Sequence, residues 1–70
     1  VILGDYQQAI KYFEQVEQLD PTYFEATYNK GYCYELLGEY DLARQCYSNV
    51  LDIQVNYKKA IEGLNRIQGK

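Results

Sequence analysis

The residue types that usually perform chemistry are sparse in this chain, which has no histidine and two cysteines among its 70 residues. A nucleophilic Cys33 or Cys46 would lack its commonest base. The two thiols stand thirteen positions apart, which does not match the Cys-x-x-Cys spacing of zinc sites. Carboxylates such as Glu39 and Asp41 stand where a helix is expected to begin, and there the helix dipole stabilises negative charge. We predict a protein that is not an enzyme, with no catalytic residue, no metal site and no cofactor.

The two thiols are expected to be unbonded. Two cysteines are too few for a disulfide framework, and a disulfide requires Cα atoms within roughly 7 Å of each other. Cys33 should point into the helix packing, whereas Cys46 should lie on a different helix, toward its outer side.

Composition and charge limit the class of partner. The formal net charge is -3, whereas a general nucleic-acid-binding protein would carry a basic face for phosphates. We therefore expect no nucleic-acid partner and a mild preference for a basic one. No run approaches the ~18 apolar residues of a membrane span, so this segment should make no membrane contact. The compartment stays unknown, with the cytoplasm slightly favoured.

An internal repeat explains which elements the chain must form. The phrase LGDYQQAIKYF at residues 3–13 returns as LGEYDLARQCY at residues 37–47, a period of 34. Within each copy, apolar residues recur at the 3, 4, 7 spacing of one helical face. A repeat of this length is typical of helical units that stack to bury their apolar faces.

The pattern predicts an all-α fold of four antiparallel helices near residues 5–19, 23–37, 39–53 and 57–68. Pro21 should separate the first two helices, Thr22 should open the second as part of a capping box, and Asn56 should cap the fourth. Gly38 provides a permissive backbone after the second helix. Gly31 should mark a close crossing between the second and third helices.

With this period, the chain resembles the tetratricopeptide repeat family, on Gly31, Tyr34, Gly38, Tyr40, Ala43, Tyr47 and Val50. The resemblance implies a short right-handed solenoid of helix-turn-helix repeats. The whole of residues 1–70 would be one fragment of it: residues 1–23 the end of one repeat, 24–57 a complete repeat, and 58–70 a C-terminal capping helix. Thr27 and Lys30 depart from the apolar residues that the family pattern expects, and we expect Lys30 to lift its amine into water.

The resemblance also implies a function, which is to hold an extended peptide or protein partner against a concave face lined by the first helix of each repeat. The residues that occupy these partner-binding positions are Glu25, Tyr28, Asn29, Tyr32, Glu35, Leu36, Lys59, Glu62 and Arg66. Helical spacing independently places the first six on one stripe. The family's clamp for a peptide's terminal carboxylate is disfavoured, because Gly63 stands at its arginine position. The alternative is a structural scaffold segment that stacks or self-associates without a groove ligand.

Self-association is expected at the first helix. By the family's spacing, only Val1, Ile2 and Leu3 represent the helix that should precede it, so its apolar stripe would be uncovered. The residues expected to bring two copies together, as a homo-oligomer, are Tyr6, Ile10 and Phe13.

Overall fold

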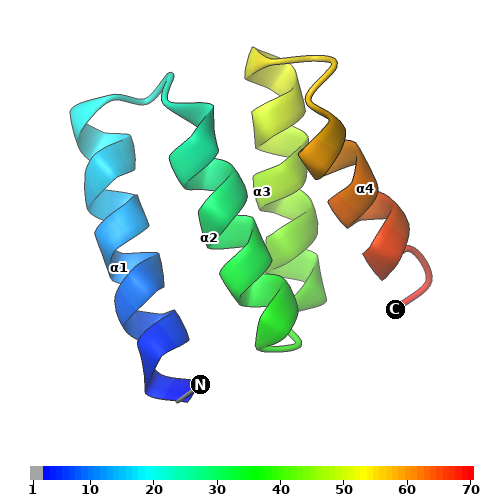
Figure 1. Cartoon of the computed structure of the whole chain (residues 1–70), viewed down its shortest axis with the longest axis horizontal. Helices are drawn as coiled ribbons and strands as arrows, with labels where there is room; N and C mark the ends of the chain where they lie inside the picture. The colour runs from blue at the N-terminus through cyan, green and yellow to red at the C-terminus, as the bar shows by residue number, and fades with distance from the viewer. Residues whose placement is uncertain (1–2) are drawn as a thin grey trace.

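The computed structural model describes residues 3–70, and side chains from residue 5 onward. Four helices follow one another along the chain: α1 (Leu3–Leu19), α2 (Phe24–Leu36), α3 (Tyr40–Ile53) and α4 (Lys58–Ile67). Consecutive helices run in opposite directions (Figure 1). The predicted all-α fold is confirmed, and every predicted boundary agrees within two residues. Val1 and Ile2, which entered the prediction of an uncovered first helix, lie outside the described residues.

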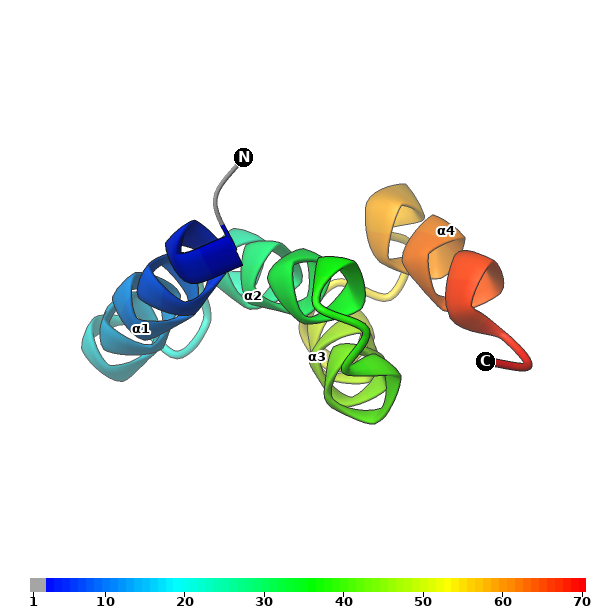
Figure 2. The same cartoon turned by 90° about the horizontal axis from the view of Figure 1, so that it is seen from below.

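The helices form a flat, two-sided array of 32 × 31 × 17 Å. Seen along the helices, α2 and α4 lie on one side and α1 and α3 on the other (Figure 2). α2 packs against both α1 and α3, α4 packs against α3, and α4 also touches α2. The side of α2 and α4 that faces away from α1 and α3 is called the α2/α4 face below. None of the helices within residues 3–70 has the length and apolar character needed to cross a membrane.

The core lies where α2, α3 and α4 meet. Its fully or almost fully buried side chains belong to Ala43, Tyr47, Val50, Ala60 and Ile67. Tyr34 and Tyr40 are half-buried against this cluster. The predicted crossing at Gly31 is also present: a Cβ added there would lie 2.8 Å from Cβ of Cys46. Only glycine lets α2 approach α3 this closely.

The helix ends correct two predictions about capping. Tyr23, not Thr22, occupies the N-cap of α2, and no side chain caps this helix. Instead, the backbone amide and hydroxyl of Thr22 both donate to Oδ1 of Asp20, which folds the loop on itself. The predicted cap Asn56 is also wrong, because Tyr57 is the N-cap of α4 and makes no side-chain cap. Gly38 does end α2 as expected, with a φ of 81°.

The cysteines are both free and both buried. Cys33 is 7% exposed, in agreement with the prediction. The expected outward position of Cys46 is wrong, because this side chain is 5% exposed and faces Gly31 across the crossing. Burial raises the pKa of both thiols, that of Cys46 to about 11.

A polar cluster joins α1 to α2. Glu17 of α1 accepts a hydrogen bond of 2.7 Å from the hydroxyl of Thr27 and forms a 2.8 Å ion pair with the amine of Lys30. The expectation that Lys30 reaches into water is therefore wrong, since its side chain is 17% exposed. Burial lowers the pKa of Lys30, but the hydrogen bond and charge of Glu17 outweigh this, and the pKa is raised. The two departures from the family pattern share one partner on the neighbouring helix.

Candidate partner-binding surface

Tyr47 of α3 supports the α2/α4 face from within. Its ring has no exposed surface and lies between two glycines. A Cβ at Gly31 of α2 would stand 3.0 Å from its Cε1, and a Cβ at Gly63 of α4 would stand 2.6 Å from its Cε2 and Cζ. Because neither glycine has a side chain, one tyrosine ring can separate two helices that would otherwise collide with it.

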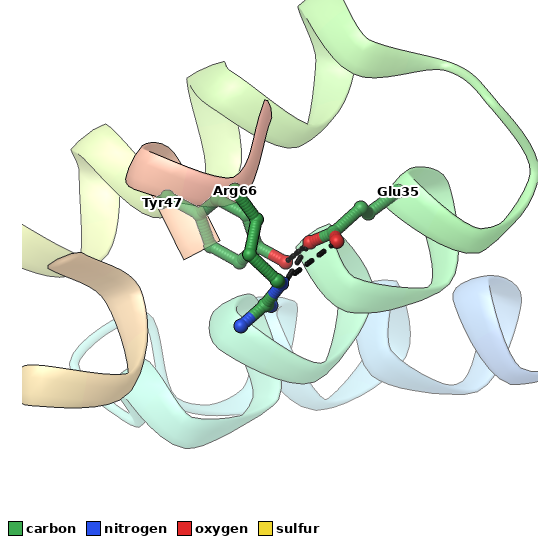
Figure 3. Close-up of polar contacts among 3 residues, drawn as sticks. All are labelled: Glu35, Tyr47 and Arg66. Carbon is green, nitrogen blue, oxygen red and sulfur yellow. Dashed lines mark hydrogen bonds and ion pairs between the residues drawn. The ribbon is translucent and has the colours of Figure 1, made fainter. Parts of the chain in front are cut away.

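The hydroxyl of Tyr47 belongs to a polar network of three residues (Figure 3). It donates a 2.7 Å hydrogen bond to Oε1 of Glu35 on α2. Arg66 of α4 grips the same carboxylate with two nitrogens, Nε at 2.9 Å from Oε2 and Nη2 at 3.0 Å from Oε1. Such a two-point contact fixes orientation as well as charge. The network therefore ties α2, α3 and α4 together at one point.

The same contacts set the protonation of the network. Hydrogen bonding from Arg66 holds the pKa of Glu35 below its ordinary value; burial opposes this shift, and the hydroxyl of Tyr47 adds to it. Burial, followed by the hydrogen bond to Glu35, raises the pKa of Tyr47 well above its ordinary value. Glu35 is thus an anion and Tyr47 a neutral donor throughout the physiological pH range.

Four further aromatic rings extend from Tyr47 toward the surface. Tyr28 contacts the Tyr47 ring at a centroid distance of 5.6 Å and meets Tyr57 edge-on at 5.7 Å. Phe24 packs edge-on against Tyr57 at 5.0 Å. Tyr32 stacks nearly parallel to Tyr28, with centroids 6.4 Å apart. These rings position one another, so Tyr28 and Tyr32 are held on a fixed platform.

Of the nine residues predicted to contact a partner, Tyr28 and Glu35 are half-buried and the other seven are exposed. The structure brings four of them together: Tyr28 stacks on Tyr32, the guanidinium of Arg66 lies 5.8 Å from the centroid of the Tyr32 ring, and Arg66 binds Glu35. The side chains of the remaining five make no hydrogen bond or ion pair within residues 5–70; they are Glu25, Asn29, Leu36, Lys59 and Glu62.

Comparison with known proteins agrees with this architecture. A family model described as "Tetratricopeptide repeat" matches residues 1–64. The chain belongs to the tetratricopeptide repeat family. It is also similar to the uncharacterized protein MJ0572 of Methanocaldococcus jannaschii, with 35% identity over 51 residues. That alignment covers 73% of this chain and 59% of MJ0572, so the chain spans less than two thirds of this relative.

Tetratricopeptide repeats generally mediate protein–protein interaction or scaffolding, and they are generally non-catalytic. For this member, sequence reasoning missed the two residues that shape the face from below. Gly63, named in the sequence analysis only because it stands at the clamp's arginine position, is the site where the Tyr47 ring enters α4. Tyr57, the N-cap residue of α4, contacts both Phe24 and Tyr28 of α2. A glycine inside an amphipathic helix was the available signal, because it often marks a close approach.

A surface depression of about 350 Å³ lies elsewhere on this tetratricopeptide repeat chain. Its lining comes from the ends of α1 and α3, the α1–α2 loop and α2, and consists of Glu17, Pro21, Thr27, Asn49, Asp52 and Ile53. None of the nine predicted partner-binding residues lines it. The carboxylate of Glu17 and the hydroxyl of Thr27 are already hydrogen-bonded to each other, and Lys30 binds the same carboxylate.

The residues predicted for self-association are only partly available. Ile10 is 5% exposed on α1, so the expectation that it lies on an uncovered stripe is wrong. Tyr6 and Phe13 are half-buried. The strongly exposed apolar side chains of α1 are instead Tyr12, at 60%, and Leu19, at 87%. Ile10 is buried because the side of α1 on which it lies is covered by α2.

Proposed function

We propose that the α2/α4 face binds an extended segment of a partner protein, without catalysing a reaction on it. The observation that carries this proposal is the stacked pair of Tyr28 and Tyr32. The Tyr32 ring is 42% exposed although it contacts both Tyr28 and Arg66. A rigid ring with an apolar body and a hydroxyl loses little conformational entropy on binding, which is why tyrosine is common at the energetic centre of interfaces.

Glu35 and Arg66 have a supporting role in this proposal. Because they bind each other at two points, they position α4 and the Tyr32 ring rather than meet the partner's charges. A ligand carboxylate would have to displace Glu35 from Arg66, so a carboxylate-terminated peptide is a poor candidate. Among the nine predicted partner-binding residues, the charges that remain unpaired are Glu25, Lys59 and Glu62, which sum to one negative charge.

The partner segment is therefore expected to be basic. The face and the whole chain, at -3, are both negative, and complementary charge speeds encounter and selects the partner. Asn29, exposed on the same stripe of α2, provides an amide that can pair with the backbone of an extended peptide. The segment would lay an apolar or aromatic side chain on Tyr32 and place lysines or arginines near Glu25 and Glu62.

The test is a titration with two pools of random peptides that differ only in containing lysine or glutamate at the charged positions. The chain should bind the lysine pool, and Tyr32→Ala should weaken that binding at least tenfold. Tyr23→Ala is the matched control, because Tyr23 is 48% exposed in the α1–α2 loop, away from the α2/α4 face.

Equal loss in both variants would place the contact on another surface. Preference for the glutamate pool would overturn the charge argument, and no binding to either pool would leave the scaffold role as the function of the fragment.

A further inference from the structure

The depression between α1 and α3 lies on the side of the array opposite the α2/α4 face. α1 and α3 stand on this side, and α2 lies between them and set back (Figure 2). Glu17 of α1 and Pro21 of the α1–α2 loop line one wall, and Thr27 of α2, 5% exposed, lines the floor. The other wall comes from α3 and consists of Asn49, Asp52 and Ile53. Three consecutive helices thus form the depression, and the groove proposal uses none of its residues.

Asn49 and Asp52 bring polar groups to this depression that have no partner in the described chain. Their side chains make no hydrogen bond or ion pair within residues 5–70. Both are exposed, and because they lie three positions apart on a helix, they are neighbours on one face of α3. An amide oxygen beside a carboxylate can accept several hydrogen bonds from one planar donor.

Asp52 stands where a carboxylate is unfavourable for the fold. It lies in the last turn of α3, which ends at Ile53 and contains no basic residue. The free carbonyl groups at the end of a helix carry partial negative charge and repel a carboxylate. One period earlier the chain has the neutral Gln18 at this position. A charge that lowers stability and is unpaired within residues 5–70 is typical of a residue kept for binding.

The charges around the depression favour a cationic ligand. Glu17 and Lys30 neutralise each other through their 2.8 Å ion pair. Asp20, next to Pro21 in the loop, is hydrogen-bonded only by the uncharged Thr22. Two negative charges therefore remain, on Asp20 and Asp52. Among residues 3–70 there is no group of three or more potential metal ligands, so an organic cation is the complementary ligand.

We propose that the depression binds the side chain of an arginine from a partner protein. The planar guanidinium has five N–H donors, which can bind the carboxylate of Asp52 at two points and also reach the amide oxygen of Asn49. The aliphatic stem of the arginine would lie on Pro21 and Ile53, whose side chains are exposed in the walls. The ammonium of lysine is more strongly hydrated and has no fork of donors, so lysine should bind more weakly.

An NMR titration of the isotope-labelled 70-residue chain tests the proposal. The probes are blocked Gly-Arg-Gly and Gly-Lys-Gly tripeptides at constant ionic strength. The arginine peptide should shift the side-chain amide signals of Asn49 and the backbone amide of Ile53 with a millimolar dissociation constant, and the lysine peptide should bind more weakly. Asp52→Asn should weaken arginine binding about fivefold, the upper end for an exposed ion pair. The same variant should raise the urea midpoint, because it removes a charge that the helix end disfavours.

Asp5→Asn is the matched control. It removes the same charge from an exposed position in the first turn of α1, away from the depression, and should leave arginine binding unchanged. The proposal is overturned if the arginine peptide shifts neither reporter, if lysine binds as tightly, or if the two variants weaken binding alike. A lower urea midpoint for Asp52→Asn would show a structural role and also overturn it. Shifts confined to Tyr28 and Tyr32 would place the arginine on the α2/α4 face instead, which contradicts this site but not the groove proposal.

Discussion

Gly63→Ala is a direct test of how α4 is held. A Cβ at residue 63 would lie 2.6 Å from both Cε2 and Cζ of Tyr47, about 1 Å inside ordinary van der Waals contact. The ring has little room to retreat, because it is fully buried and its other edge lies against Gly31. The added methyl group must therefore push α4 away from α3.

Two effects of opposite sign decide the magnitude. Alanine favours a helix over glycine by about 1 kcal/mol, whereas overpacking a buried contact costs about 1–3 kcal/mol. Moving α4 also strains the contact between Glu35 and Arg66, which links α2 to α4. We expect a net loss of about 1–2 kcal/mol in the free energy of unfolding. In a domain of this size each kcal/mol lowers Tm by about 4–8 °C.

Urea unfolding followed by circular dichroism measures this loss as a shift of the midpoint. Asn65→Ala is the matched control, because it changes an exposed position of the same helix and should raise stability by about 0.5 kcal/mol. In a Tyr47→Leu background the cost of Gly63→Ala should largely vanish, since the ring that causes it is gone. The reasoning is refuted if Gly63→Ala stabilises the chain as Asn65→Ala does, or if its cost is the same in both backgrounds.

Three further outcomes test the polar contacts and the thiols. Glu17→Leu alone should lower the free energy of unfolding in urea by about 1–3 kcal/mol, because it leaves Thr27 and Lys30 without their partner. The triple variant Glu17→Leu, Thr27→Ile and Lys30→Leu copies the apolar residues of α3 and α4 at these positions, and it should be at least as stable as the parent. Because Arg66 holds the pKa of Glu35 below its unfolded value of about 4.3, the stability from this pair is present above that pH and lost as the pH falls through the lower folded value. Glu35→Gln should therefore lower stability near neutral pH and flatten its acid dependence, and an unchanged acid limb would contradict the pairing. Since burial raises the pKa of Cys46 to about 11, a thiol reagent at about pH 8 should label Cys33 and Cys46 slowly in the folded chain and rapidly after unfolding; rapid labelling of the folded chain would contradict their burial.

The helices could be predicted from the sequence because each of them follows the 3.6-residue period over at least two turns. The crossing at Gly31 could also be predicted, because a glycine within such a helix signals a close neighbour. The exact ends of the helices were less predictable. Thr22 has the sequence form of a capping residue, but the carboxylate of Asp20 binds its amide and hydroxyl first, and the helix starts one residue later without a side-chain cap. Local competition between hydrogen-bond partners decided that case.

The candidate surface was predictable as a stripe but not as a set of contacts. Helical spacing places Glu35 and Arg66 on the correct sides of their helices, yet they are 31 positions apart, and nothing in a single sequence states that they bind each other. The burial of Cys46 could have been predicted, because it lies three positions after Ala43 and four before Val50, on the face that both residues bury. The pairing of Glu17 with Lys30 again joins two helices, and the sequence alone shows only two polar residues in apolar positions.

The two helix pairs differ at the positions of those polar residues. One period after Glu17, Thr27 and Lys30, the chain has Leu51, Ile61 and Leu64, so the second helix pair fills the same positions with apolar side chains.

At these three positions the α1/α2 pair is polar and the α3/α4 pair is apolar. If α1 were to pack on α4 in place of α2, the carboxylate of Glu17 would meet Ile61 and Leu64 without a donor, and an unpaired buried charge is strongly destabilising. A second exchange carries a similar cost, because the Tyr47 ring that enters at Gly63 would meet the side chain of Asn29, the residue one period earlier. The two interfaces therefore specify the order in which nearly identical helices pack, and a repeat protein needs such a distinction because its period alone does not provide one.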